Sequence, residues 1–553
     1  MLALVAGDPA HAGAADTLTG VETAAHDGTP AGETLETRQF IDALVRSLSA
    51  APTAPTPISL ATAIRTAVAN NPGVQAGGRE RELARQQILA QLGAFDPRFN
   101  SDLSFSNEHV LTSNVLEQSG GLPQRLGTLD RERFVWDFSV SKLFQYGTEF
   151  EADFSNDRRI SSSQFQALNP VFEPTFGIAV SQPLFRDFAG LDARTNVLVS
   201  RNNSKRAVSD FQAQLSNFAA RVVVAYWNRV LFAALVDVRR YSLELAEALV
   251  DDTSARVKIG TRPKVANTEA RANAAARQEE LITATNDLDL ASRTLQYTVM
   301  LGIDQTGPVP VIPADQHHPA PQPLSREHSL ATALDHRPEM RSARLGVDSA
   351  VLDIRRSRRL MLPGLDFVMD WELQGLSGVP DPEGVSSETD SYGLALDRLS
   401  SGDFHRFFVG FRVDVPFTNT QARSRLAQAE IEKRRQLEQL QRIASDIALE
   451  VEDAVGDVAS ALERVGAAAL SRELAEENLR DQQKRYDVGR VTTTDILVFQ
   501  EILRNAMATQ ALAVTDHAIA VAQLKRAEGS LLAEYAINVG FEDAPDAPWW
   551  TQF

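Results

Sequence analysis

Residues 485–500 read RYDVGRVTTTDILVFQ, and they interrupt a long run of charged and alanine-rich sequence that favours helix on both sides. A partial echo, RVKIGTRPKVANT, occupies residues 256–268 and also lies inside helical sequence. Gly489 and Gly260 can each end a helix in the left-handed conformation, and a threonine or aspartate after Gly489 can cap the next helix. The sequence therefore predicts that a long helix breaks at each of these glycines and that a second helix starts a few residues later.

The two glycine breaks belong to a plan that the chain repeats. Pro72 and Pro338 each stand where a helix should begin, and Pro97 and Pro363 each stand where that helix should give way to strand. Both pairs are related by the same offset (338 − 72 = 363 − 97 = 266), whereas the two glycines are closer (489 − 260 = 229). Each copy is thus predicted to run helix, strands, long helix, glycine turn, long helix, with the second copy shorter in its strand region.

The repeats divide the chain into five predicted segments. The first is rich in Ala, Thr, Pro and Gly and is expected to be a disordered export or linker segment; its start has small residues but no basic region, so a signal peptide is left open. His317 and His318 lie in a proline-rich connector that is expected to be solvated, because two histidines alone do not make a metal site. The segments are 1–57, the first repeat 58–302, the connector 303–324, the second repeat 325–540 and the tail 541–553.

Two helices are predicted to be very long, at about 192–258 and 421–487, each on the order of 100 Å at a rise of ~1.5 Å per residue. Their apolar residues recur in steps of three and four, so the helices should lie along one another. The most apolar stretch, which follows Arg221, is broken by Asn228 and Arg229, and we interpret it as packed helix rather than a membrane span. The predicted seams are Phe211, Leu215, Phe218, Val222 and Ala225, and Ile447, Val451, Ala454, Val458, Ala461 and Val465.

Strands are predicted between the helices of each copy. RFVWDFSVSKLF (133–144) and TEFEADFSND (148–157) alternate apolar and polar residues around a turn at 145–147, and the second copy has a shorter pair at 365–374 and 406–415. One face is apolar and the other carries carboxylates and hydroxyls, which fits a sandwich or a barrel with lipid outside and water inside. So few strands cannot close a barrel, which predicts that several chains contribute.

Composition excludes several classes of function. The chain has 553 residues, a net charge of −18 and no cysteine. The acidic balance disfavours nucleic-acid binding, and the absence of cysteine excludes disulfides, zinc–thiolate sites and thiol catalysis. The chain carries none of the common hydrolase, nucleotide-binding or zinc-protease motifs, so we expect no enzyme, no cofactor and no metal.

The order of these motifs resembles the TolC family of outer-membrane efflux and secretion ducts. The likeness covers about residues 58–540 and rests on the duplicated plan, the NNP and HRP helix starts, the QPLF and VPF strand ends, and the run from Tyr486 to Gly489 followed by DIL at 495–497. It implies a mixed, mainly α fold in which strands from a homotrimer close one barrel in the outer membrane of a Gram-negative-type bacterium. It also implies that the helices prolong this barrel as a periplasmic tunnel. The first copy has four strand candidates and the second two, so a trimer would hold roughly 12 strands, or roughly 18 if 133–156 joins the barrel.

The resemblance also implies the roles of residues at the hairpin turns. Asp495 matches an acidic ring at the tunnel constriction of family members, although it could instead simply cap a helix. This chain has Val498 where some members have a second acid, so the gate could be weaker or could include Glu269. The remaining residues implied at the turns, which would dock an adaptor, are Gly260, Thr261, Arg262, Tyr486, Gly489 and Arg490.

The function implied is passive exit for substrates that an inner-membrane transporter delivers through a periplasmic adaptor, in efflux or type I secretion. Barrel strands would contact outer-membrane lipid. The alternative is an elongated coiled-coil scaffold of the periplasm that has a small β domain and no channel. The two hypotheses differ in whether the protein needs a membrane or detergent.

Overall fold

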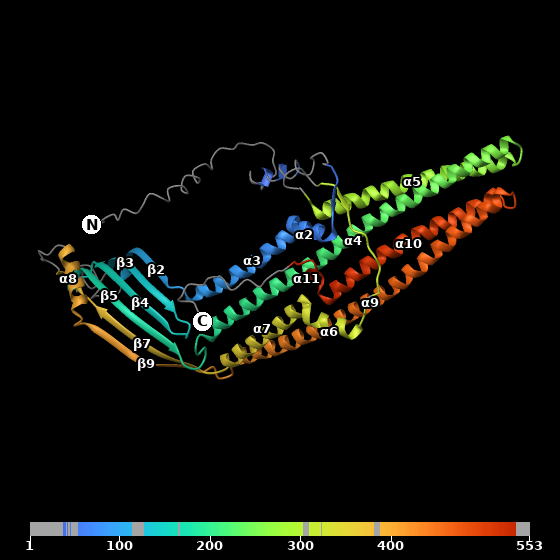
Figure 1. The fold of residues 1–553 in the computed structure, drawn as a ribbon. Helices are drawn as coiled ribbons and strands as arrows, with labels where there is room; N and C mark the ends of the chain where they lie inside the picture. The colour runs from blue at the N-terminus through green and yellow to red at the C-terminus, as the bar shows by residue number, and fades with distance from the viewer. Residues whose placement is uncertain are drawn as a thin grey trace.

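The chain is a long rod with a β-sheet at one end and two helical hairpin tips at the other (Figure 1). The computed structural model describes residues 37–39, 41–42, 45, 54–112, 127–163, 166–301, 309–321, 323–380 and 388–537. The helices are α2 (Leu60–Asn70), α3 (Pro72–Leu92), α4 (Leu191–Lys258), α5 (Lys264–Val299), α6 (Arg326–His336), α7 (Pro338–Leu360), α8 (Glu388–Ser401), α9 (Thr420–Asp487), α10 (Thr493–Glu528) and α11 (Leu531–Glu534). The strands are β1 (Thr56–Ile58), β2 (Arg98–Thr112), β3 (Gly127–Leu143), β4 (Glu149–Ser161), β5 (Leu168–Pro183), β6 (Val311–Pro313), β7 (Gly364–Gln374), β8 (Ser377–Pro380) and β9 (His405–Asp414).

The predicted long helices are present, and the duplication is regular. Helices α4 and α9 have 68 residues each, and α5 and α10 have 36 each. Every bound of the second pair lies 229 residues after its counterpart in the first (420 − 191 = 487 − 258 = 493 − 264 = 528 − 299 = 229). The two hairpins therefore have the same length in both copies, and the difference between the copies lies in the strand region.

The prolines act as the sequence predicted. Pro72 and Pro338 occupy the first turn of α3 and α7, where a missing amide hydrogen costs nothing. Asn71 caps α3 by accepting hydrogen bonds from the amides of Gly73 and Val74 at 2.9 and 3.2 Å. Strands β2 and β7 begin one residue after Pro97 and Pro363.

Six strands form an antiparallel sheet in the order β2-β3-β4-β5-β7-β9, and the short β8 also pairs with β5. The predicted turn at 145–147 joins β3 to β4, and Gly147 adopts a φ of 80° there. Strands β3 and β4 thus lie inside the sheet and pair on both sides. Two segments that the sequence analysis did not predict, β8 and α8, follow β7; Tyr392 of α8 packs its ring on Trp136 and Phe172.

The register assigns every strand residue to one of two faces, because directly opposed residues in antiparallel strands share a face. We call them the apolar face and the polar face. On β7 the apolar-face residues from Leu365 to Leu373 carry no charge. They span about 27 Å along the strand, which a tilt of about 40° would shorten to about 21 Å, close to the apolar band of membrane barrels. Apolar-face residues include Leu103, Phe105, Phe134, Trp136, Phe138, Phe154, Phe176, Ile178, Phe367, Met369, Trp371, Phe407, Val409 and Phe411.

Next to the sheet the helices lie in the order α3, α4, α7, α9, and farther away in the order α5, α4, α10, α9. By length and composition, α4 alone among the described helices could cross a membrane. The stretch after Arg221 instead supplies Val222, Tyr226 and Trp227 to the largest core cluster. This agrees with the prediction that the stretch is packed helix. The seam from Ile447 to Ala461 on α9 is buried in a second cluster with α6 and α10.

The part of the connector that the structure describes before residue 322, 309–321, is half-buried against the helices, which corrects the expectation that it is solvated. Strand β6 pairs in parallel with β1, whose residues Thr56 and Pro57 belonged to the segment expected to be disordered. Near this pair the side chain of His317 lies against Trp227 and 2.8 Å from Nδ1 of the buried His517. The expectation failed because its packing partners are far away in sequence. The possible signal peptide and the C-terminal WWTQF lie outside the described residues.

A tyrosine hydroxyl ties the connector to the N-terminal strand. The amides of Ala314 and Asp315 each donate a hydrogen bond to Tyr226 Oη at 3.1 Å, and this hydroxyl can donate to the carbonyl of Ile58 or to Asp315 Oδ2, each also at 3.1 Å. Burial raises the pKa of Tyr226 to about 12. The hydroxyl therefore stays protonated and available as a donor.

Candidate functional site: the hairpin tips and the polar face of the sheet

Both hairpins turn in the same way. Gly260 and Gly489 have φ of 79° and 77°, the left-handed conformation that was predicted for them. In each turn the residue after the glycine donates its amide to a carbonyl five residues earlier: Thr261 to Arg256 and Arg490 to Arg485, both at 2.9 Å. No atom lies within 4 Å of where a side chain at either glycine would begin. Glycine is needed at these positions for backbone conformation and not for space.

The second hairpin restarts with a capping box. The Thr492 hydroxyl accepts a hydrogen bond from the amide of Asp495 at 3.2 Å, and Asp495 Oδ2 accepts from the amide of Thr492 at 2.8 Å. Hydrogen bonds from Thr492 lower the pKa of Asp495, which is therefore ionised near neutral pH. In the first hairpin Pro263 precedes α5 without a side-chain cap. Asp495 is thus both a cap and an exposed carboxylate at the tip.

The two tips are joined through Tyr486. Its ring is 4% exposed and lies among Leu249, Ala270 and Ile496. The guanidinium carbons of Arg256 and Arg262 lie 4.9 and 4.7 Å from the ring centre. Tyr486 was predicted to dock an adaptor, but its side chain is buried between the hairpins and is not on the surface.

Polar contacts close the same junction. Arg256 of the first hairpin forms an ion pair with Asp487 at 3.0 Å, and Arg262 donates to the carbonyl of Val491 at 2.8 Å. The Thr494 hydroxyl donates to Glu269 Oε2 at 3.2 Å. Arg256 and Asp487 were not predicted as site residues, although both lie within four residues of the turn glycines.

A second set of ion pairs joins the hairpins farther from the tips. Arg504 of α10 donates to Glu280 of α5 at 2.6 Å, and Arg277 of α5 pairs with Glu501 of α10 at 2.7 Å. Burial alone would raise the pKa of Glu280, but Arg504 and Arg277 lower it overall. These half-buried charges oppose separation of α5 from α10.

The outermost surface of the tips is apolar as well as polar. Ile259 and Val488 precede the two glycines and are 73% and 70% exposed. Thr261 and Arg490 are exposed beside them. The two equivalent turns thus expose the same kind of surface at the end of the rod: one large apolar side chain beside polar residues.

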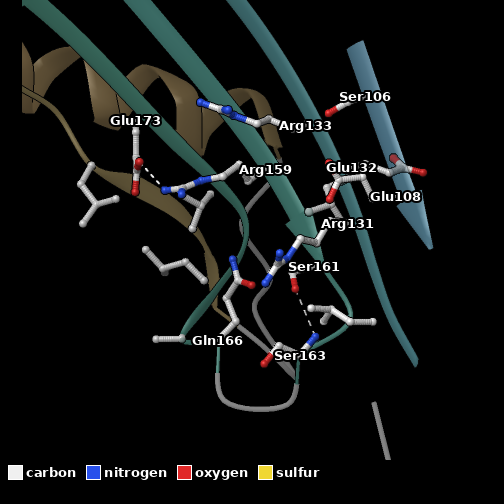
Figure 2. A pocket seen from close by; sticks show the side chains of 16 residues that line it. Ser106, Glu108, Arg131, Glu132, Arg133, Arg159, Ser161, Ser163, Gln166 and Glu173 are labelled. Carbon is white, nitrogen blue, oxygen red and sulfur yellow. Dashed lines mark hydrogen bonds and ion pairs between the residues drawn. The ribbon is translucent and has the colours of Figure 1, made fainter. Parts of the chain in front are cut away.

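At the other end of the molecule, the polar face of the sheet is mainly acidic. Near its outer end a hollow of about 750 Å³ lies among Arg131, Arg133, Arg159 and Glu173 (Figure 2). Arg133 pairs with Asp157 at 2.8 Å, and Arg159 pairs with Glu173. The carboxylates of this face are Asp102, Glu108, Asp137, Glu149, Glu151, Asp153, Asp157, Glu173, Asp366, Asp370, Glu372 and Asp414, and its arginines are Arg98, Arg131, Arg133, Arg159, Arg406 and Arg412.

Within the part of the chain that the structure describes, no three His, Asp or Glu side chains are arranged to hold a metal ion. Water and ions in contact with the polar face would meet a surface with more carboxylates than arginines.

Comparison with known proteins agrees with this architecture. Residues 330–530 match the family model described as outer membrane efflux protein. The fold is similar to the CmeC outer-membrane channel of Campylobacter jejuni, with 16% identity, 92% of this chain and 91% of that chain covered, and a TM-score of 0.58. It is also similar to CusC (16% identity, 87% and 95% covered, TM-score 0.61) and to the outer membrane protein VceC of Vibrio cholerae (17%, 85% and 96%, TM-score 0.58).

No curated protein sequence matches the chain. The family match lies within the predicted second repeat, and the similar structures extend over both repeats. The resemblance drawn from the sequence is thereby confirmed. Residues 330–530 thus match the outer membrane efflux protein family, and the chain has the fold of outer-membrane channels.

Proposed function

We propose that the protein is the exit duct of an efflux or type I secretion system. Three copies close a barrel in the outer membrane, and their helices continue it as a tunnel toward the inner membrane. A periplasmic adaptor and an inner-membrane transporter deliver the substrate and supply the energy. The duct itself is passive and uses no cofactor.

The observation that supports this proposal most strongly is the sheet. Its apolar face exposes large side chains, including Leu103 at 71% and Phe411 at 66%, while its polar face is lined with charge. A soluble scaffold would gain nothing from such an exposed aromatic surface, whereas lipid would cover it. The edges of β2 and β9 have no strand partner within the described chain, and backbone groups in a membrane must be paired.

At the periplasmic end we propose that Asp495 and Glu269 line the constriction. Three copies of Asp495 around a threefold axis would attract cations and repel one another. The adaptor would dock on the turns, which comprise Ile259, Gly260, Thr261, Arg262, Val488, Gly489 and Arg490; all of these except the half-buried Arg262 are exposed. Tyr486 would hold the two hairpins together from inside.

Conductance of the reconstituted protein in planar bilayers tests the duct, and two substitutions separate the roles of Asp495. Asp495→Asn removes the charge but keeps an acceptor for the Thr492 amide, whereas Asp495→Ala removes both. A gating charge predicts that both variants lose block by divalent cations and conduct more. A capping role alone predicts that Asp495→Asn behaves as the parent protein does.

The matched control for this experiment is Asp481→Asn. Asp481 is an exposed carboxylate near the same tip, on α9, the helix that precedes the turn. It pairs with Lys484 at 3.0 Å. Its loss should leave divalent block unchanged. Absence of any cation-preferring conductance from folded parent protein would argue against a duct and favour the scaffold.

A further inference from the structure

We infer that six strands from each of three chains close an 18-stranded barrel, in which β2 of one chain pairs with β9 of the next. This inference rests on the proposed trimeric duct and goes beyond it by fixing the strand count, the subunit interface and the width of the exit. It follows from the sheet of a single chain, its two free edges and the helices beneath it.

The segment 133–156, which could have stayed outside the barrel, forms the hairpin of β3 and β4 and is fully part of the sheet. Strand β3 pairs with β2 over 15 consecutive residues, from Arg98 to Thr112, and with β4 over 13, from Arg131 to Leu143. Strand β4 pairs with β5 over 11 residues. A barrel that left the β3–β4 hairpin outside would have to break the pairing of β3 with β2 and of β4 with β5.

The two free edges fit each other. Strands alternate in direction along the order β2-β3-β4-β5-β7-β9, so β2 runs away from the helices and β9 runs back toward them. A second copy placed beside the first therefore brings β9 against β2 in the antiparallel sense. Even-numbered residues of both strands lie on the polar face, so the pairing continues one acidic inner wall and one apolar outer wall.

Six strands also match the width of the helical layer that each chain contributes. Four helices, α3, α4, α7 and α9, lie next to the sheet, and at about 9.5 Å between axes they span about 38 Å of the wall. Strands about 4.8 Å apart and tilted by about 40° take about 6.3 Å each, so six strands span about 38 Å and four only about 25 Å. At this tilt, only the sheet with the β3–β4 hairpin included matches the width of the helical wall.

The consequence is a wide exit. A circumference of about 113 Å gives a backbone diameter of about 36 Å, against about 24 Å for 12 strands of the same tilt. The barrel then does not restrict bulky, hydrated cargo more than the helical tunnel does. Discrimination by size falls to the periplasmic tips, and the inner wall of the barrel acts through its negative charge.

Disulfide trapping tests the interface, and the natural absence of cysteine makes every introduced thiol unambiguous. Ser104→Cys in β2 is combined in turn with Phe408→Cys, Gly410→Cys or Arg412→Cys in β9, all on the polar face. Mild oxidation in lipid vesicles should convert at least one pair to covalent dimers and trimers on a denaturing gel. Combining Ser104→Cys with Val135→Cys is the positive control, because these residues oppose each other within one chain.

The competing arrangement has its own signature. A barrel without the β3–β4 hairpin would place β2 beside β5, so Ser104→Cys is combined with Val171→Cys, Glu173→Cys or Thr175→Cys in β5, all on the polar face; β5 is already paired on both sides, so no crosslink is expected. A crosslink from β2 to β5 in place of the Ser104–Val135 control would indicate 12 strands and overturn this inference while leaving the proposed duct intact. A chain that is monomeric by native mass measurement, with no crosslink between chains at any pair, would overturn both.

Discussion

Tyr486→Ala should loosen the two hairpin tips from each other. The substitution removes a ring that is 4% exposed and that lies between Arg256 and Arg262. Truncation of a buried aromatic residue costs about 3–5 kcal/mol, and two cation–π contacts at this partly exposed site account for about 0.5–1 kcal/mol each. Because part of the ring packs on its own hairpin, we take the lower figure, about 3 kcal/mol, for separation of the tips. This corresponds to about a 100-fold larger open population.

Hydrogen exchange of the protein in lipid measures this opening directly. Amides in 249–272 and 485–500 should exchange about 100-fold faster in Tyr486→Ala, whereas those of α3, at the far end of the rod, should not change. Tyr486→Phe keeps the ring and loses only a 3.4 Å contact between its hydroxyl and Thr493, so its exchange should stay within about fivefold of the parent protein. Unchanged exchange in Tyr486→Ala would refute the role of this ring in joining the hairpins.

Three further predictions concern the turn, the connector and pH. Gly489→Ala should destabilise its tip by about 1 kcal/mol because alanine disfavours a φ of 77°. Gly456→Ala, in open space inside α9, should instead stabilise the helix by about 0.5–1 kcal/mol. Equal effects of the two variants on thermal unfolding would contradict the backbone argument. Tyr226→Phe should lower the free energy of unfolding by about 1–3 kcal/mol, because the amides of Ala314 and Asp315 lose their acceptor, and a thermal midpoint equal to that of the parent would count against this contact. Burial lowers the pKa of His317 and His517 below the ordinary value of 6.5, so the unfolded chain binds protons first and stability should fall as pH drops below about 6.5. His517→Phe should flatten this pH dependence, whereas His318→Gln, an exposed neighbour, should retain it; equal slopes in the two variants would exclude the buried pair as its source.

The features that sequence predicted well are those set by nearby residues. Left-handed glycines, prolines in the first turn and periodic apolar residues act over a few positions, and they placed the long helices to within one residue of 191–258 and 420–487. Alternation along 133–144 and 148–157 likewise revealed strands and their faces. Repetition reinforced these local patterns, because the same plan recurs with a constant offset through both hairpins.

The features that were missed depend on partners far away in the chain. Arg256 meets Asp487 across 231 positions, and His317 meets His517 across 200, so neither pair has a local pattern. The connector was expected to be solvated because its prolines resemble a linker, yet the helices beneath it offer Trp227 and Tyr226 as packing surfaces. Tyr486 was placed on the surface because it adjoins a turn, although its ring points between the hairpins.

The most direct test of the duct is an image reconstruction of the detergent-solubilised protein. The account predicts a particle with threefold symmetry, in which one closed barrel continues without a step into a helical tunnel that ends at six hairpin tips. A single rod that stays dissolved without detergent, with β2 and β9 unpaired, would contradict it.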